Sequence, residues 1–215
     1  MPRAAEAPAT ERAQKRGRIS VRALLLLAAV AVAVYGIDQG AKYLITQNVE
    51  LGHSVHVLGD ILQLHHVTNS GAAFSLASGF TWILSVVAAG VIVFIVIFAP
   101  RIRSLGWATM FGLVLGGALG NLTDRLFREP GFGTGHVVDF LQIYGFPAIF
   151  NGADVAIVSS MVLFILLSLR GVALDGTRTP MVRTTQKPAS QKPASQKTAS
   201  QKTASPKPAA PKPED

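Results

Sequence analysis

Two aspartates, Asp139 and Asp154, stand on either side of a short turn in residues 136–154, HVVDFLQIYGFPAIFNGAD. Asp139 lies in an apolar, strand-like run, and Asp154 lies in the first turns of a strongly apolar helix. Gly145 and Pro147 between them favour a turn. If that turn brings the two carboxyl groups together in a poorly hydrated site, they share one proton and titrate as a pair.

Such a pair can hydrolyse a peptide bond. The ionised carboxylate takes a proton from a water molecule, which attacks a carbonyl carbon. The protonated carboxyl group polarises the carbonyl oxygen and later supplies a proton to the leaving amine. This is the chemistry of aspartic proteases. The alternative is that Asp154 only caps the helix or pairs locally and that Asp139 only ends a strand.

Further polar side chains have the spacing of neighbours on a helix. Asn151 is three residues before Asp154, so its amide can orient that carboxylate. Asp38 and Lys42 are four residues apart and can form an ion pair. We expect structural or substrate-binding roles for these groups and for Asn121, Asp124 and Arg125. The planar guanidinium of Arg125 can bind a phosphate or a peptide carbonyl through two hydrogen bonds.

Two other catalytic chemistries fit the sequence less well. Lys42 is the only lysine between residues 15 and 187, and it could activate Ser70 or Ser75 as a nucleophile. The five histidines could suggest zinc, but no HExxH motif occurs and their spacing is more typical of a β-hairpin. They are His53, His56, His65, His66 and His136. The chain has no cysteine, which excludes thiol nucleophiles and disulfides.

The elements that must position these residues are membrane spans. Of the 215 residues, 49% are hydrophobic and only 15% are charged, a balance typical of a polytopic membrane protein with polar tails. Long apolar runs predict four transmembrane helices, over residues 20–45, 80–100, 104–123 and 148–169. The first run could instead be a cleaved secretory signal peptide. We favour a retained helix that carries Asp38 and Lys42 near its outer end.

The segments outside the spans complete the expected fold. Residues 54–58 and 61–67 are β-prone and predict a hairpin. The fold class is therefore a membrane all-α protein with four transmembrane helices and a small extracytoplasmic β-hairpin or cradle. Residues 1–18 are expected to be a flexible tail, residues 19–171 the membrane domain, and residues 172–215 a disordered Lys-, Pro- and Ala-rich tail.

The distribution of charge predicts the orientation. All the basic residues except Lys42, Arg125 and Arg128 lie in the two tails or in the loop between the second and third spans. The positive-inside rule places those parts, and hence both termini, in the cytoplasm. The net charge of +8 is therefore a topology signal, and nucleic-acid binding is the weaker alternative.

Helix geometry predicts the depth of the polar groups. Asp38, Asn121 and Asp154 lie about 24–27 Å along their helices from the cytoplasmic ends of the spans, at 1.5 Å per residue. The hydrocarbon core is roughly 30 Å thick, so the three groups converge near its outer boundary. Ionisable groups at that depth are costly unless they are paired or functional.

The chain resembles lipoprotein signal peptidase, also called signal peptidase II, over about residues 20–170. The resemblance lies in five motifs in the family's order: DQGAK at 38–42, NSGAAF at 69–74, GNLTDR at 120–125, VVDF at 137–140 and FNGAD at 150–154. Two departures are Ala41, where the family often has Ser or Thr, and the short separation of Asp139 and Asp154.

The resemblance implies a four-span aspartic endopeptidase that cuts diacylglyceryl-modified prolipoproteins just before the lipidated cysteine and frees the signal peptide. Asp139 and Asp154 would be the catalytic pair. Substrate-binding or supporting roles would fall to Asp38, Lys42, Asn69, Gly71, Asn121, Asp124, Arg125 and Asn151. No metal or organic cofactor is implied.

The expected partners are prolipoprotein substrates and membrane lipids, with no nucleic acid. The chain is expected to act as a monomer in the bacterial inner (plasma) membrane, with its active site near the outer face. The alternative is a small transporter or proton-relay subunit that uses Asp38, Lys42, Asp124 and Asp154. A relay needs acids spread through the membrane depth, whereas these gather near one face. A purely structural membrane protein would leave the aspartates unexplained.

Overall fold

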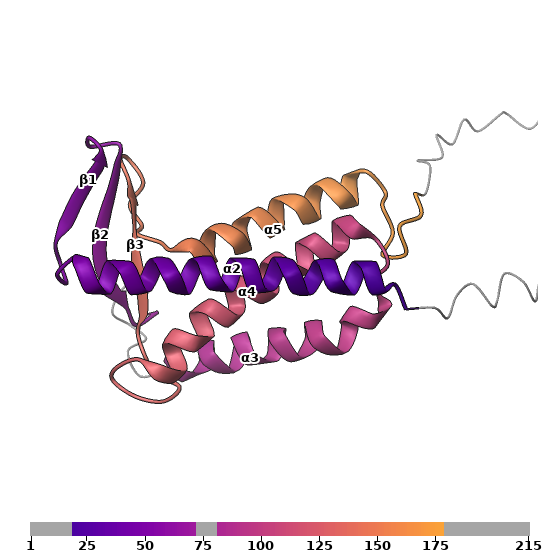
Figure 1. The fold of residues 1–215 in the computed structure, drawn as a ribbon, viewed down its shortest axis with the longest axis horizontal. Coiled ribbons are helices and arrows are strands. Elements are labelled where there is room, and N and C mark those ends of the chain that lie inside the picture. Colours follow the sequence, from indigo (N-terminus) through magenta and orange to yellow (C-terminus); the bar gives the residue numbers. More distant parts are fainter. Residues whose placement is uncertain (1–18, 72–80, 179–215) are drawn as a thin grey trace, which may run out of the picture. The chain divides into compact units, whose positions relative to one another are not determined.

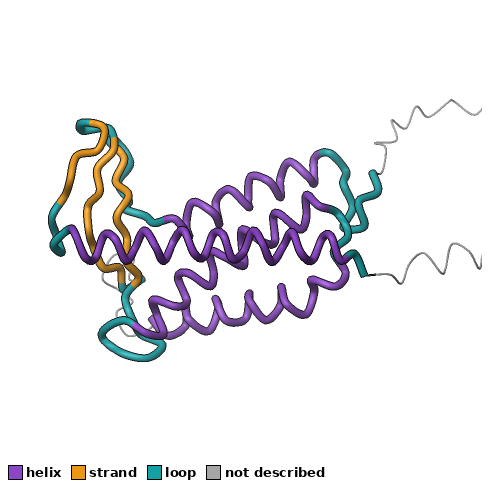
Figure 2. The backbone as a smooth tube through the Cα atoms, in the orientation of Figure 1, coloured by secondary structure: helices purple, strands orange, loops and turns teal. Residues whose placement is uncertain are grey.

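The computed structural model describes residues 19–71 and 81–178, which all belong to one compact unit. The described chain forms long helices and a small sheet (Figures 1 and 2). The helices are α2 (Val21–Asn48), α3 (Thr81–Phe98) with the short 3-10 helix η2 (Ala99–Arg101), α4 (Leu105–Phe127) and α5 (Gly152–Leu169). The strands are β1 (Ser54–Leu58), β2 (Leu62–Asn69) and β3 (Val137–Ile143). The predictions for residues 1–18, 72–80 and 179–215 lie outside the described residues.

The four helices have the length and apolar composition of membrane spans. The 28 residues of α2 extend about 42 Å, which exceeds a hydrocarbon core of roughly 30 Å. Large apolar side chains such as Leu25 and Val32 are exposed on its surface, as expected where a helix faces lipid. The prediction of four spans with a small β element is confirmed.

Helix α4 lies in contact with each of the other three helices. Its glycines allow the backbones to approach closely, since they place no side chain between the helices. A Cβ added at Gly112 would lie 2.8 Å from the carbonyl oxygen of Leu27 in α2, and one at Gly117 would lie 2.7 Å from that of Ala153 in α5. The polar residues of α4 are therefore carried between α2 and α5.

The sheet lies at one end of the bundle, and its strands run across the direction of the helices (Figure 1). The strand order is β1-β2-β3, antiparallel throughout. The register pairs Val67 of β2 with Asp139 of β3. Ile45, near the end of α2, packs against Val138 and Phe140, which fixes β3 on the end of the bundle.

Helix α5 begins at Gly152, four residues later than the predicted start at Ala148. Residues before it are held in an extended conformation, because the backbones of Phe150 and Leu141 exchange hydrogen bonds of 2.7 and 3.1 Å. Asn151 then caps the helix. The later start places Asp154 in the first turn of α5 rather than in its second.

Residues 172–178, which the sequence assigned to the disordered tail, are part of the described structure. The carbonyl oxygen of Leu174 accepts hydrogen bonds from the backbone N–H groups of Arg103 (2.9 Å) and Ser104 (3.0 Å). Leu174 also packs against the apolar core of the bundle. The chain therefore returns to the start of α4 after α5 ends.

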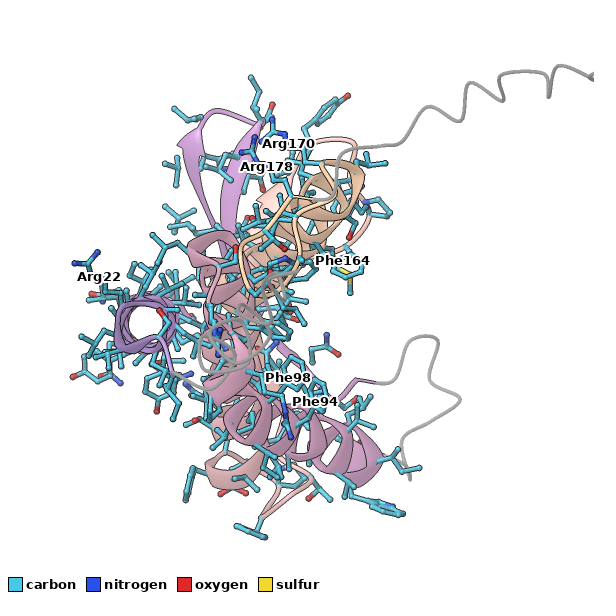
Figure 3. All side chains as sticks on the ribbon, turned by 90° about the vertical axis from the view of Figure 1, so that its right-hand side faces the viewer. Arg22, Phe94, Phe98, Phe164, Arg170 and Arg178 are labelled. Carbon is cyan, nitrogen blue, oxygen red and sulfur yellow. The ribbon has the colours of Figure 1, made fainter. Side chains whose placement is uncertain are left out.

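The described part of the chain begins and ends at the end of the bundle opposite the sheet (Figure 1). Arg22, Arg170 and Arg178 gather at that end (Figure 3). The described ends therefore lie at one end of the bundle near basic residues, and their predicted cytoplasmic location stays a prediction.

Candidate active site

The carboxylate of Asp139 is held in place by amide groups from two elements. Its side chain is only 2% exposed. Asn69, at the end of β2, donates to Oδ2 at 2.8 Å, and Asn151 donates to Oδ1 at 2.6 Å. Burial raises the pKa of Asp139 from 3.8 to about 6; the Asn69 hydrogen bond opposes this rise, and the charge of Asp154 adds to it.

Asp154 is held by the start of α5 and by α4. Asn151 and Asp154 form a capping box: the Asn151 side chain accepts from the backbone N–H of Asp154 at 3.0 Å, and Asp154 Oδ2 accepts from the backbone N–H of Asn151 at 3.2 Å. The amide of Asn121 donates to Asp154 Oδ1 at 3.0 Å. The side-chain amide of Asn151 thus contacts the backbone of Asp154 rather than its carboxylate, contrary to the expectation from the sequence; the side-chain amide on the carboxylate is that of Asn121.

The two aspartates meet at Asn151, although they are separated in sequence by a turn. The same asparagine side chain donates to Asp139 and accepts from the backbone of Asp154. Both acids also line one cavity of about 500 Å³, here called the front cavity. Its other lining residues are mostly apolar: Asn69, Ile143, Phe146, Ala148, Ile149, Phe150, Val155, Val158 and Ser159.

Asp38, Lys42 and Asp124 form a fully buried ion cluster beside the pair. Lys42 Nζ lies 2.8 Å from Asp38 Oδ2 and 2.7 Å from Asp124 Oδ2. It also donates to Asn121 Oδ1 at 3.1 Å. The predicted pairing of Asp38 with Lys42 is confirmed, and the structure adds Asp124 from α4 as a second partner of the lysine.

This cluster reaches both aspartates through the backbone. Asp38 Oδ1 accepts from the N–H of Ala153, which precedes Asp154, at 2.8 Å. Asp124 Oδ2 accepts from the N–H of Val138, which precedes Asp139, at 3.3 Å. A side chain of α2 thus holds the start of α5 beside Asp154, and a side chain of α4 holds β3 beside Asp139.

Gly71 and Arg125 complete the set of residues singled out in the sequence. The N–H of Gly71 donates to Asn69 Oδ1 at 2.7 Å, which orients the Asn69 amide toward Asp139. Gly71 has a φ of +80°, and a Cβ there would press against Leu84 and Arg125. Arg125 is 8% exposed, and its Nη1 has no hydrogen-bond partner among the described residues. Arg125 therefore lies beside the network with donor capacity left over.

One contributor was not singled out from the sequence. Arg128 donates from Nε to Asp124 Oδ1 at 2.7 Å, and its four-residue spacing from Asp124 on α4 is the signal that could have found it.

The alternative chemistries find less support in this arrangement. Lys42 Nζ is engaged by two carboxylates and an amide, so it is not placed to activate Ser70; Ser75 lies outside the described residues. Over the described ranges, no three His, Asp or Glu side chains cluster as metal ligands. The proton-relay alternative is not supported, because the buried acids gather at the sheet end of the bundle.

The family model described as "Signal peptidase (SPase) II" matches residues 30–170. The lipoprotein signal peptidase of Leifsonia xyli subsp. xyli is 61% identical over 171 residues, which cover 80% of this chain and 79% of that protein. The lipoprotein signal peptidase of Rhodococcus jostii is 49% identical over 154 residues, which cover 72% of this chain and 77% of that protein.

Two solved structures of bacterial membrane enzymes have the same fold. The first is 28% identical, with a TM-score of 0.62, over 73% of this chain and 93% of the other. The second is 29% identical, with a TM-score of 0.61, over 71% of this chain and 97% of the other.

Proposed function

Because the chain belongs to the signal peptidase II family, we propose that it is an aspartic endopeptidase that removes signal peptides from diacylglyceryl-modified prolipoproteins. The observation that carries the aspartic mechanism is the meeting of Asp139 and Asp154 at Asn151, on the wall of one cavity. The other members of the network position these two groups.

The reaction follows from one proton shared between the two carboxyl groups. A carboxyl group with its pKa raised to about 6, as in Asp139, keeps its proton to a higher pH than an ordinary carboxyl group does. The ionised member of the pair removes a proton from a water molecule, and the water oxygen attacks the scissile carbonyl carbon. The protonated member donates to the carbonyl oxygen, which becomes the hydroxyl of a tetrahedral intermediate.

Collapse of the intermediate completes the cleavage. The C–N bond breaks, the leaving nitrogen takes a proton from the carboxyl group that had accepted one from water, and the hydroxyl proton returns to the other carboxylate. The products are a new carboxylic acid, which then ionises in water, and a free amine, and the pair again holds one proton. The proton belongs to the pair and is not assigned to one residue.

The front cavity supports a substrate with an extended apolar part. Phe146, Phe150, Val155 and Val158 line it together with the two carboxyl groups, and they present apolar surface to a signal peptide and to a lipid-modified residue. Arg125 and Asn69 are the nearby donors that can bind backbone carbonyl groups of the substrate. The cut would then fall before the lipidated cysteine, as in the family.

The proposed catalytic groups Asp139 and Asp154 and the asparagine between them belong to one chain, and we propose that the protein acts as a monomer. The basic end of the bundle (Figure 3) supports an orientation in the bacterial plasma membrane with both termini in the cytoplasm and the sheet outside. Because the chain has no cysteine, Asp60→Cys offers a clean test: a membrane-impermeant maleimide should label it in intact cells, and labelling only after lysis would reverse the orientation.

The mechanism is tested with purified full-length protein and a diacylglyceryl prolipoprotein. Asp139→Asn and Asp154→Asn should each remove cleavage by at least about 1,000-fold, while gel filtration shows a folded protein. The unlipidated precursor serves as the substrate control, and Asp175→Asn, at the far end of the bundle, as the matched variant. Full turnover by either active-site variant would refute the aspartic mechanism.

A further inference from the structure

A second cavity of about 640 Å³ lies on the opposite face of the sheet from Asp139. We call it the rear cavity. Thr68 and Val138 line it, whereas their chain neighbours Asn69 and Asp139 line the front cavity. Successive residues of a strand point to opposite faces, so the two cavities are separated by the sheet. The proposed cleavage makes no use of the rear cavity.

Arg128 lines the rear cavity with part of its hydrogen-bonding capacity free. Its Nε donates to Asp124 Oδ1 at 2.7 Å, and this bond fixes the plane of the guanidinium. Within the described residues, its two Nη atoms have no hydrogen-bond or ion-pair partner. A guanidinium held at Nε with both Nη groups available is suited to a planar, bidentate contact with oxygen atoms of an anion.

His66 is a second fixed polar group on the lining. It is 7% exposed, and its Nδ1 lies 2.7 Å from the carbonyl oxygen of Val49. A carbonyl oxygen can only accept, so Nδ1 carries the hydrogen. Nε2 is left for a ligand, as an acceptor in the neutral ring and as a donor in the protonated ring. Three more groups on the lining can hydrogen-bond: Thr46, Thr68 and His136.

The remaining lining residues set the chemical character of the occupant. Glu129 is the one carboxylate on the lining, and it favours an occupant that also carries a hydroxyl or an amine. Leu51 and Phe127 are 60% and 78% exposed and form an apolar rim where α2 and α4 end. Large apolar side chains exposed at the ends of two membrane spans offer a surface for lipid acyl chains.

We propose that the rear cavity binds the phosphodiester headgroup of a membrane lipid. The Nη groups of Arg128 contact the phosphate oxygens, and Glu129 contacts the polar end of the headgroup. The acyl chains leave past Leu51 and Phe127. Asp124 balances the charge of Arg128 at Nε, so the anion is held by directional hydrogen bonds as much as by net charge.

Binding is tested on the full-length protein in detergent by native mass spectrometry. The probes are dihexanoyl-phosphatidylglycerol, inorganic phosphate, and dihexanoylglycerol, which has the same acyl chains without the phosphate. We expect one phospholipid per chain, with affinity that falls as salt rises, and no comparable binding of dihexanoylglycerol. Inorganic phosphate that displaces the phospholipid at equal concentration would assign the site to free phosphate, which keeps the phosphate chemistry but overturns the lipid.

Three variants locate the binding. Arg128→Gln should weaken it at least tenfold, because a charge-assisted bidentate contact is lost. Thr68→Phe should block binding by filling part of the rear cavity, while Arg128 stays unchanged. Thr68 is exposed in a strand, where Phe is well tolerated. Arg22→Gln, at the other end of α2, removes the same charge and should change nothing. Equal binding in all three variants, or equal binding of dihexanoylglycerol, would overturn the proposal, and neither outcome depends on cleavage.

Discussion

The two ends of the helical bundle are held together by different forces. At the sheet end, buried charges and amides from α2, α4, α5 and the sheet contact one another directly, as in the cluster around Lys42. In the opposite half, apolar side chains and glycines pack closely, with Ala108 and Ile102 fully buried. The stability of the sheet end therefore depends on specific ion pairs and hydrogen bonds, and the stability of the opposite half depends on how well the side-chain volumes fit together.

Helix α4 contains both kinds of contact within a few turns. A Cβ at Gly116 would lie 2.7 Å from the carbonyl oxygen of Ala31. Helices α4 and α2 are therefore in close van der Waals contact at this glycine. One turn and a half further, Asn121 bonds to Lys42 and Asp154. The close approach at Gly116 lets the short side chain of Asn121 reach its partners on α2 and α5. Packing thus sets the distances that the polar end requires.

The largest expected effect comes from removing the central cation. Lys42→Met keeps the volume but leaves the buried carboxylate of Asp38 without its ion-pair partner, and breaking such a pair costs about 3–5 kcal/mol. Cleavage by the protein that remains folded should fall about 100-fold, because both backbone links to the aspartates loosen. Thermal unfolding and initial rates measure the two effects.

The double variant Asp38→Asn with Lys42→Met separates charge from position. Asp124 retains Arg128, and the Asn oxygen can still accept from Ala153, so much of the lost stability should return while cleavage stays low. If stability did not return, the polar end would depend on the lysine for more than charge balance.

A smaller effect is expected from added volume in the apolar half. Gly116→Ala forces α2 and α4 apart and should lower the free energy of unfolding by about 1–3 kcal/mol. The rate per folded molecule should fall less than for Lys42→Met. Gly90→Ala in α3 is the matched control, because a Cβ there meets nothing within 4 Å. A loss of stability in the control as large as in Gly116→Ala would remove the distinction between the two ends.

The smallest effect concerns pH. Asp139 has a pKa of about 6 when folded, above 3.8, so the native state binds more protons than the unfolded state between these values. Stability from this group is therefore fully present below about pH 4 and lost as pH rises toward 6. Cleavage should fall at higher pH as the pair loses its proton.

Asn69→Ala removes the hydrogen bond that lowers the pKa of Asp139. The pKa should rise further, and the alkaline limb of the rate profile should move to higher pH. Initial rates from pH 4 to 9 check this prediction. Asn48→Ala is the control, since the Asn48 side chain donates to the carbonyl oxygen of Leu44 in its own helix. An alkaline limb that moves to lower pH would contradict the assigned cause.

Local patterns in the sequence predicted the parts that depend on neighbours along the chain. The apolar runs predicted the four spans, and the four-residue spacing predicted the pairing of Asp38 with Lys42. Both depend on helix periodicity alone. The strand-like run around Asp139 became β3 for a similar reason.

Contacts between segments that are distant in the sequence could not be predicted from these local patterns. The start of α5 depends on the backbone pairing of Phe150 with Leu141. The residues next to Phe150 in the sequence do not predict this pairing. The second partner of Lys42, Asp124, comes from another helix. The rear cavity depends on how the sheet, α2 and the loop after α4 fit together, and its residues are scattered from Thr46 to Val138.

The links from Asp38 and Lys42 to the far end of the sequence also bear on biosynthesis. Asp38 is made early, yet its acceptor contact with Ala153 requires α5, which is made after the other helices that the structure describes. A chain without α5 therefore keeps the Asp38–Lys42 ion pair within α2 but lacks the contact that joins it to the start of α5, and it lacks Asp154. Cleavage by the proposed mechanism would then become possible only in a single late step of synthesis.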